Sequence, residues 1–415
     1  MRDLLITLVV LGSLPLILRT PVVGVLMWVW ISVMNPHTQG WGFATQFPFA
    51  QIIAVTTMLS LLFTRAPRAL PFTALTCALL AFIVWMNITL PFSLFFDESL
   101  PHWNKVMKIM LMTIVCIMLV KSRRDVHALI WVLALSLGYY GVKGGLFTLR
   151  NGGGDRVWGP EGTFIGDNNA LALALIMIIP LMHYLLQQEQ RRWRRYVLVV
   201  AMLLCALAAL GTYSRGALLA IGAMSVMLWL KSKNKVTLGV LFAFAIPLLL
   251  ALMPPQWFSR IDTIKTYQED ESAMGRINAW KMAWALAKDH FFGGGFQIYD
   301  QFVFGLYAPV PSDVHAAHSI YFQVLGEHGF VGLGLYVVLG GVLWRNAGWI
   351  LRHAGADPEL RWAASLAAMI QTSLIGFAVG GAFLSLLYFD VPYYLVAAVV
   401  ATRALVQARL AEIGG

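Results

Sequence analysis

Apolar residues run through this chain in long blocks that are separated by short polar segments. The blocks lie near residues 3–18, 21–34, 49–64, 70–90, 105–120, 126–148, 168–187, 196–212, 215–230, 236–253, 318–344, 362–384 and 387–405. Most are close to the ~20 residues that a helix needs to cross a ~30 Å hydrocarbon core. The first two are shorter, so they form either one broken span or a re-entrant pair. The pattern predicts an all-α fold, a polytopic transmembrane bundle of about 12 helices.

Composition supports this fold, because 59% of the 415 residues are hydrophobic and 12% are charged. That is about half the ~25% charged share of a soluble protein, which excludes a water-soluble domain. The net charge of +10 does not indicate nucleic acid, because Lys and Arg clusters alternate with loops that hold few of them. Such alternation follows the positive-inside rule. We therefore place the clusters in the cytoplasm, with membrane lipids and no nucleic acid as partners. The clusters are Arg65 and Arg68; Lys121, Arg123 and Arg124; Arg191, Arg192, Arg194 and Arg195; Lys231, Lys233 and Lys235; and Arg345, Arg352 and Arg361.

One loop on the opposite face is much longer than the others, residues 254–317. It contains a helix-compatible run at residues 275–289, so we expect a long, part-helical loop on the outer surface of the membrane. The predicted organisation is an N-terminal transmembrane bundle (residues 1–253), this loop, and C-terminal transmembrane helices (residues 318–415). All three parts belong to one integral membrane domain.

Two arginines stand where an anion could bind. Arg215 lies in the turn at residues 211–216, where a hairpin requires small residues but no guanidinium. It is either an interfacial anchor or a fork that grips a phosphate with two hydrogen bonds. Arg276 opens the most helix-compatible run of the long loop, where free backbone N–H groups favour an anion. The alternative for Arg276 is an ordinary surface arginine.

Two histidines, His315 and His318, lie three residues apart where the loop re-enters the membrane. A metal site is not expected, because no carboxylate or thiol stands at a matching position. A histidine at the water interface is suited to taking a proton from a sugar hydroxyl. The alternative for His318 is a hydrogen-bonded histidine at the start of a helix. The three cysteines all lie in apolar blocks, so we predict no disulfide, no metal and no cofactor.

Four further ionisable residues are weaker candidates. Glu327 lies nine residues beyond His318, on the other side of a helix and about 13 Å deeper, so a structural role is expected. Lys143 stands inside an apolar block, which is costly. Arg156 lies in the glycine-rich segment 149–167, which lacks the lysine of a nucleotide-binding loop. Lys143 and Arg156 could add positive potential to a cavity on the outer face. Asp390 stands near the last outer turn.

The order of several short motifs resembles the O-antigen ligase and O-antigen polymerase superfamily. These motifs are Ser214-Arg215-Gly216-Ala217, Gly275-Arg276, Ala279-Trp280, Ala317-His318 and Glu327-His328-Gly329. The N-terminal half is similar to the branch of probable O-glycosylation ligases in Met34-Asn35-Pro36-His37, Trp158-Gly159-Pro160 and Asp167-Asn168-Asn169. One departure is Ser319, where the family usually has asparagine. The resemblance spans nearly the whole chain and rests on the order of the motifs.

The resemblance implies an inverting, metal-independent glycosyltransferase of the all-helical GT-C type. The donor would be a glycan on undecaprenyl diphosphate, and the acceptor the lipid A-core of lipopolysaccharide at the periplasmic face of the bacterial inner membrane. Arg215 and Arg276 would hold the diphosphate, with Arg156 and Lys143 as further ligands, while His318 would deprotonate the acceptor hydroxyl. His315, Glu327 and Asp390 remain secondary candidates.

Other functions stay open at this point. A polymerase or a protein O-glycosylation ligase of the same family would differ only in its acceptor. A transporter or flippase would fit the number of spans, but it favours ionisable residues at the bilayer midplane and internal repeats. No clear repeat is seen in this sequence. A structural scaffold would leave the arginine and histidine positions unexplained.

Overall fold

The computed structural model describes residues 1–64, 69–232, 234–251, 253–255, 257–258 and 271–414. These residues form helices and no strand, which confirms the all-α prediction. Arg65, Arg68 and Lys233 of the predicted cytoplasmic clusters, and residues 259–270 of the long loop, lie outside the described part. The division into residues 1–253, 254–317 and 318–415 stays a prediction.

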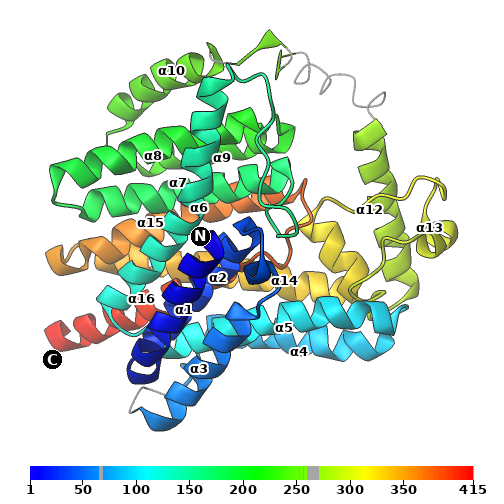
Figure 1. The fold of residues 1–415 in the computed structure, drawn as a ribbon, viewed down its shortest axis with the longest axis horizontal. Coiled ribbons are helices and arrows are strands. Elements are labelled where there is room, and N and C mark those ends of the chain that lie inside the picture. Colours follow the sequence, from blue (N-terminus) through cyan, green and yellow to red (C-terminus); the bar gives the residue numbers. More distant parts are fainter. Residues whose placement is uncertain (65–68, 233, 252, 256, 259–270, 415) are drawn as a thin grey trace.

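The α-helices follow one another with short connections for most of the chain (Figure 1). They are α1 (Arg2–Arg19), α2 (Pro21–Met34), α3 (Phe49–Phe63), α4 (Ala74–Thr89), α5 (Phe96–Leu119), α6 (Arg123–Arg150), α7 (Asn168–Gln188), α8 (Arg192–Gly211), α9 (Arg215–Lys231), α10 (Lys235–Ala251), α12 (Glu271–Asp289), α13 (Gln301–Tyr307), α14 (Ile320–Ala354), α15 (Arg361–Gly381) and α16 (Asp390–Gly414). Short 3-10 helices occur at η1 (Pro36–Gln39), η2 (Phe43–Thr45), η3 (Leu90–Phe92) and η5 (Pro358–Leu360).

Eight helical segments in the described residues are long and apolar enough to cross a membrane. They are Ala74–Phe92, Phe96–Leu119, Arg123–Arg150, Asn168–Gln188, Arg192–Gly211, Ile320–Ala354, Pro358–Gly381 and Asp390–Ile413. Shorter apolar helices occur at Pro21–Met34, Phe49–Phe63 and Lys235–Leu248. The chain is therefore a multi-pass membrane protein, and the count of about 12 spans stays a prediction. The first two apolar blocks form separate helices, with Pro21 at the first position of α2, where its missing N–H costs nothing.

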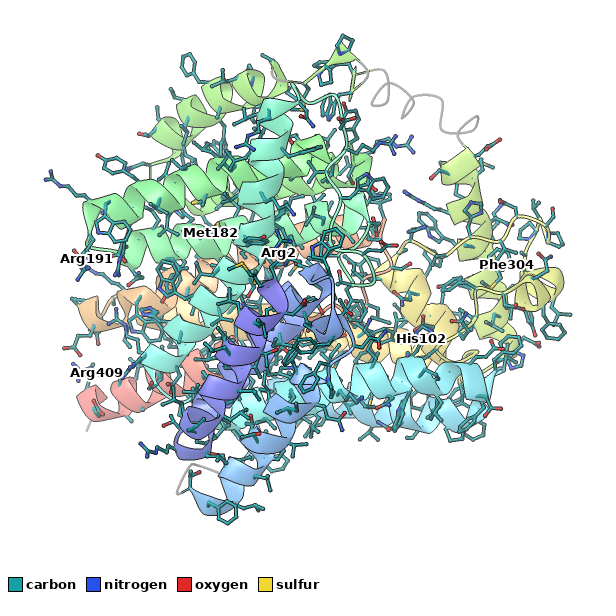
Figure 2. All side chains as sticks on the ribbon, in the orientation of Figure 1. Arg2, His102, Met182, Arg191, Phe304 and Arg409 are labelled. Carbon is teal, nitrogen blue, oxygen red and sulfur yellow. The ribbon has the colours of Figure 1, made fainter. Side chains whose placement is uncertain are left out.

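Helices α4, α5, α7, α8, α14 and α15 run roughly parallel across the view of Figure 1, α6 crosses them steeply, and α12 and α13 lie together at one end of the bundle. Figure 2 shows Arg191 and Arg409 at the opposite end from Phe304 of α13. This is the arrangement that the positive-inside rule predicts when α12 and α13 lie on the outer side.

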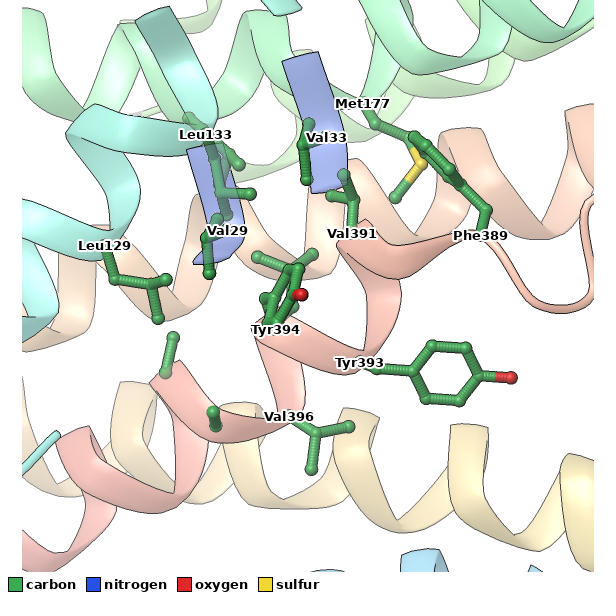
Figure 3. Packing of buried hydrophobic residues seen from close by; sticks show 14 of the residues in the cluster. Val29, Val33, Leu129, Leu133, Met177, Phe389, Val391, Tyr393, Tyr394 and Val396 are labelled. Carbon is green, nitrogen blue, oxygen red and sulfur yellow. The ribbon is translucent and has the colours of Figure 1, made fainter. Parts of the chain in front are cut away.

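Helix α7 lies at the centre of the bundle. Of its most apolar stretch 83% is buried, compared with 28% for α14. The core around it includes α2, α6 and the start of α16, whose buried side chains meet in Figure 3. Tyr394 of α16 accepts a hydrogen bond from Trp28 Nε1 of α2 at 2.9 Å, so its hydroxyl is satisfied inside the apolar core.

Helix α14 is broken at Gly329, where φ is +69° and ψ is −173°. This region of backbone space is open essentially to glycine alone. The break frees carbonyl groups of the preceding turn, and a distant segment satisfies them. Gly294 N donates to Gly326 O at 2.8 Å and Gly295 N to Glu327 O at 3.0 Å. Trp85 Nε1 of α4 donates to the His328 carbonyl at 2.9 Å. The glycine-rich segment after α12 is thereby fixed against α14.

Gly329→Ala should lower the stability of the protein by about 1–3 kcal/mol, because alanine is strained at this φ and ψ. A Cβ there would also clash with the Phe291 carbonyl oxygen. The measurement is the apparent melting temperature of the solubilised protein. Gly334→Ala is the matched control, because a Cβ at Gly334 in the same helix meets nothing within 4 Å. Equal melting temperatures for the two variants would contradict the prediction.

Candidate functional site

His318 occupies a strained position just before α14. Its φ is +42°, in the left-handed region that residues with a Cβ seldom adopt. Its backbone N–H donates to Ser385 Oγ at 2.9 Å, in the segment that joins α15 to α16. Strained backbone persists only where the surroundings hold it, and it gathers at functional sites. The conformation of His318 is thus imposed by the fold around it.

Helix α12 is fixed against the segment that leads to His318. Trp280 Nε1 donates to the Ala317 carbonyl at 2.6 Å. The Asn278 amide donates to the carbonyl oxygens of Val310 and Asp313 at 2.9 and 3.0 Å. His315 packs against the start of the same helix, because a Cβ at Gly275 would lie 2.6 Å from its Nδ1. These contacts bring α12, and Arg276 with it, next to the histidine segment.

Burial and the charges around His318 determine the pKa of its imidazole. Burial lowers the pKa of His318, and the positive charges of Arg276 and His315 lower it further, while Asp167 raises it. His315 is itself paired with Asp313, with 2.8 Å between Nδ1 and Oδ1. The His318 imidazole is therefore neutral near pH 7 and free to accept a proton.

Arg215 begins α9 directly after a turn that is fixed from several sides. Ser214 Oγ accepts a hydrogen bond from Ala217 N at 3.2 Å and so caps the helix. Tyr213 has a φ of +60°, and its hydroxyl donates to the Gly153 carbonyl. Asn168 at the start of α7 donates to the Thr212 carbonyl at 2.7 Å. The backbone that carries Arg215 is therefore held in one position.

The segment between α15 and α16 connects the two halves of the site. A Cβ at Gly216, next to Arg215, would lie 3.3 Å from the Phe383 side chain. Ser385, two residues further on, accepts the hydrogen bond from His318. Gly216 and His318, far apart in the sequence, thus both contact the short segment that joins α15 to α16. Two of the three non-glycine residues with positive φ in the described chain, Tyr213 and His318, belong to this region.

Sequence reasoning named Asp167 only as part of the Asp167-Asn168-Asn169 motif and gave it no role at the site. Its carboxylate caps α7 by accepting hydrogen bonds from Asn169 N at 2.8 Å and Ala170 N at 3.0 Å. It also acts electrostatically on His318. An aspartate before an apolar block predicts the cap, but its position beside His318 depends on tertiary packing. Ser385 had no signal in the sequence for the same reason.

Lys143 and Arg156 line one cavity, and neither is among the charged groups that act on His318. This cavity of about 350 Å³ is lined by residues of η1, α6 and the segment that follows α6. The Arg156 guanidinium lies 5.9 Å from the centre of the Tyr213 ring, two residues from Arg215. The cavity is therefore adjacent to the turn that carries Arg215.

Glu327 lies in a buried polar network within the bundle. Tyr388 donates to its carboxylate, and Gln323 Nε2 donates to Glu327 Oε1 at 3.1 Å. His328 Nε2 lies 2.7 Å from the Tyr388 hydroxyl. This agrees with the structural role expected for Glu327, since the network holds α14 to the segment between α15 and α16. Asp390 is buried elsewhere, with Ser32 as its polar neighbour.

These features define a multi-pass, all-helical membrane protein with a neutral histidine and two arginines at one end of its bundle. Residues 200–337 match the family model described as O-antigen ligase. Residues 1–190 match one described as a family of unknown function. No curated protein matches the chain significantly.

The match covers about a third of the chain; it supports an O-antigen ligase family assignment and confirms the resemblance seen in the motifs from Ser214 to Gly329. The matched region contains Arg215, Arg276 and His318. The family implies a membrane glycosyltransferase-like enzyme with lipid-linked glycan substrates and a lipid-anchored acceptor. In the described residues no three His, Cys, Asp or Glu side chains gather at metal-binding distance.

Proposed function

We propose that the protein is an O-antigen ligase, an inverting and metal-independent glycosyltransferase. It transfers a glycan from undecaprenyl diphosphate to the lipid A-core. The observation that carries the proposal is the strained His318, held to Ser385 in the same short segment that Gly216, next to Arg215, contacts through Phe383, with Arg276 near enough to lower the His318 pKa. A base and two guanidinium groups are the parts that glycosyl transfer from a diphosphate requires.

In this mechanism His318 takes the proton of the acceptor hydroxyl, and the oxygen attacks the anomeric carbon of the donor sugar. The bond from that carbon to the diphosphate oxygen breaks with inversion, and its electron pair leaves on the diphosphate. Arg215 and Arg276 bind the diphosphate bidentately and stabilise its growing charge. No further energy source is required, because the donor is already activated.

The proposal includes the location of the protein. We place the bundle in the bacterial inner membrane as a GT-C-type enzyme with about 12 spans, and the site at the periplasmic face. Arg191 and Arg409 at the opposite end of the bundle support this orientation (Figure 2).

The decisive experiment is complementation of a ligase-deficient Gram-negative strain, together with reconstitution using lipid-linked glycan and lipid A-core. Wild type should produce lipopolysaccharide with a ladder of glycan lengths. Arg215→Ala, Arg276→Ala and His318→Ala should not, at matched membrane levels. Normal ladders from all three variants would contradict the site.

The same assay separates the alternatives. Glycosylated protein in place of lipopolysaccharide would identify a protein O-glycosylation ligase, and lengthened lipid-linked glycan would identify a polymerase. Movement of the lipid-linked glycan across the bilayer without transfer would identify a flippase. The first two outcomes keep the site and change the acceptor, whereas the last removes the enzyme proposal.

The activity should depend on pH through His318. Because the pKa of His318 is lowered, kcat/KM should be level near pH 7 and fall only at lower pH, where the imidazole is protonated. Asp167 raises this pKa, so Asp167→Asn should move the acid limb to still lower pH. Asparagine keeps the cap of α7. Asp155→Asn, in the same segment, is the control, because it should leave the acid limb of the kcat/KM profile where it is in wild type. A limb that stays in place or moves to higher pH in Asp167→Asn would contradict the role of His318.

A further inference from the structure

The cavity that holds Lys143 and Arg156 has the chemistry of a binding site for an acidic sugar. Its volume of about 350 Å³ lies in the range of small-molecule pockets. Its lining residues are Thr38, Gln39, Tyr140, Lys143, Gly144, Phe147, Arg156, Val157, Trp158, Gly159 and Pro160. This lining includes two cations and no carboxylate. An anion is therefore the ligand that the charges favour.

The other lining side chains suit a sugar ring. The Trp158 ring is 59% exposed at the cavity wall, which leaves a flat apolar face for the C–H groups of a sugar to pack on. Thr38 and Gln39 supply hydroxyl and amide groups that can hydrogen bond to sugar hydroxyls. An aromatic face, neutral polar groups and two cations together match a sugar that carries a carboxylate.

The cavity is formed by elements that are already fixed in place. Gln39 Nε2 donates to the Tyr140 hydroxyl at 2.8 Å, which joins η1 to α6. Val157 N donates to the Gly211 carbonyl at 3.0 Å. The same valine is pressed on α6, because a Cβ at Gly144 would lie 2.7 Å from its Cγ1. A preformed wall lowers the cost of ordering on binding.

A second cavity of about 570 Å³ adjoins this one. The two share Trp158 and Gly159, and the second extends to Asp167, which acts electrostatically on His318. Its lining also includes Glu161 and has no cation. An acidic group is therefore repelled from the second cavity and drawn to Lys143 and Arg156. This charge contrast would orient a chain of sugars that occupied both cavities.

We propose that the Lys143 and Arg156 cavity is a subsite for a uronic acid residue of the glycan substrate, away from the bond that reacts. That this uronic acid belongs to a transferred glycan rests on the proposed function, whereas the binding of an acidic sugar in the cavity does not. The site selects glycans that carry a carboxylate, and it does so through two side chains that take no part in the proton transfer.

Binding is tested with the full-length protein in nanodiscs by calorimetry, using a soluble pair of disaccharides that differ in one group. Cellobiouronic acid carries the carboxylate and cellobiose does not. Wild type should bind the acidic disaccharide at least about 10-fold more tightly, as expected for a charge-assisted hydrogen-bond pair of about 1.4 kcal/mol or more. The preference should vanish in the double variant Lys143→Gln, Arg156→Gln. Arg150→Gln is the matched control, because Arg150 lies on α6 outside the cavity lining and should keep the preference.

Three results would overturn the proposal: equal affinity for both disaccharides, no binding of either, or a preference that survives in the double variant. Inorganic phosphate at the same concentration should not displace the acidic disaccharide, and displacement would mean a site for free anions. His318→Asn should bind both disaccharides as wild type does. Selective binding by a protein that transfers no glycan would keep this proposal and remove the proposed function, so the two can fail separately.

Discussion

Replacing His318 with asparagine should reduce glycan transfer by about 10²–10⁴-fold, the usual contribution of a general base. Asparagine cannot take the proton of the acceptor hydroxyl, but it tolerates the left-handed backbone that His318 adopts, with φ of +42°. The backbone hydrogen bond to Ser385 is also kept, since it uses only the main-chain N–H. The loss should therefore appear in kcat, with the folded protein present at wild-type levels.

The measurement is the initial rate of transfer from lipid-linked glycan by the reconstituted protein, with the melting temperature recorded in parallel. His102→Asn is the control, because His102 is an exposed histidine on α5 (Figure 2) and should leave the rate unchanged. A His318→Asn variant that transfers at the wild-type rate would rule out the histidine as the base. A variant that fails to fold would show a lowered melting temperature, and the pH profile of Asp167→Asn then tests the same role independently.

The sequence predicted the helical class, which the structure confirms, and the place of the site at one end of the bundle, which stays a prediction. This was possible because hydrocarbon thickness imposes long apolar blocks and the positive-inside rule marks their ends. The break of α14 at Gly329 was not predictable, because the apolar block continues through it. The break depends on the glycine-rich segment at residues 293–295, which reaches α14 from another part of the chain. Nothing in the local pattern signals that contact.

The candidate site was predicted in part. Three site residues could be named from the sequence. Arg215 is a charged residue in a hairpin turn at the membrane boundary, where burial of a charge is costly, Arg276 opens a helical run, and His318 lies where the long loop re-enters the membrane. Ser385 could not be named, and Asp167, known only from its motif, could be given no role at the site, because a loop serine and an N-cap aspartate are ordinary in any chain. Only the packing of α7 and of the segment after α15 gives them their positions.

Replacing Arg215 with lysine should lower kcat/KM by about 10²–10³-fold, nearly as much as replacing it with alanine. The planar guanidinium donates two parallel hydrogen bonds to a phosphate, whereas an ammonium is a point charge on a flexible stem. The turn that carries Arg215 is fixed by Ser214 and Tyr213, so a lysine there has little freedom to reach a different geometry.

Comparison of Arg215→Lys with Arg215→Ala separates charge from geometry. If attraction alone bound the diphosphate, lysine would restore most of the activity, and added salt would weaken wild type and Arg215→Lys alike. If the bidentate fork is required, the lysine variant stays close to alanine at every salt concentration. Arg191→Lys, at the opposite end of the bundle (Figure 2), should keep wild-type kcat/KM and controls for the chemical change itself. An Arg215→Lys variant with more than about a tenth of wild-type activity would refute the bidentate role, because that loss corresponds to less than about 1.4 kcal/mol.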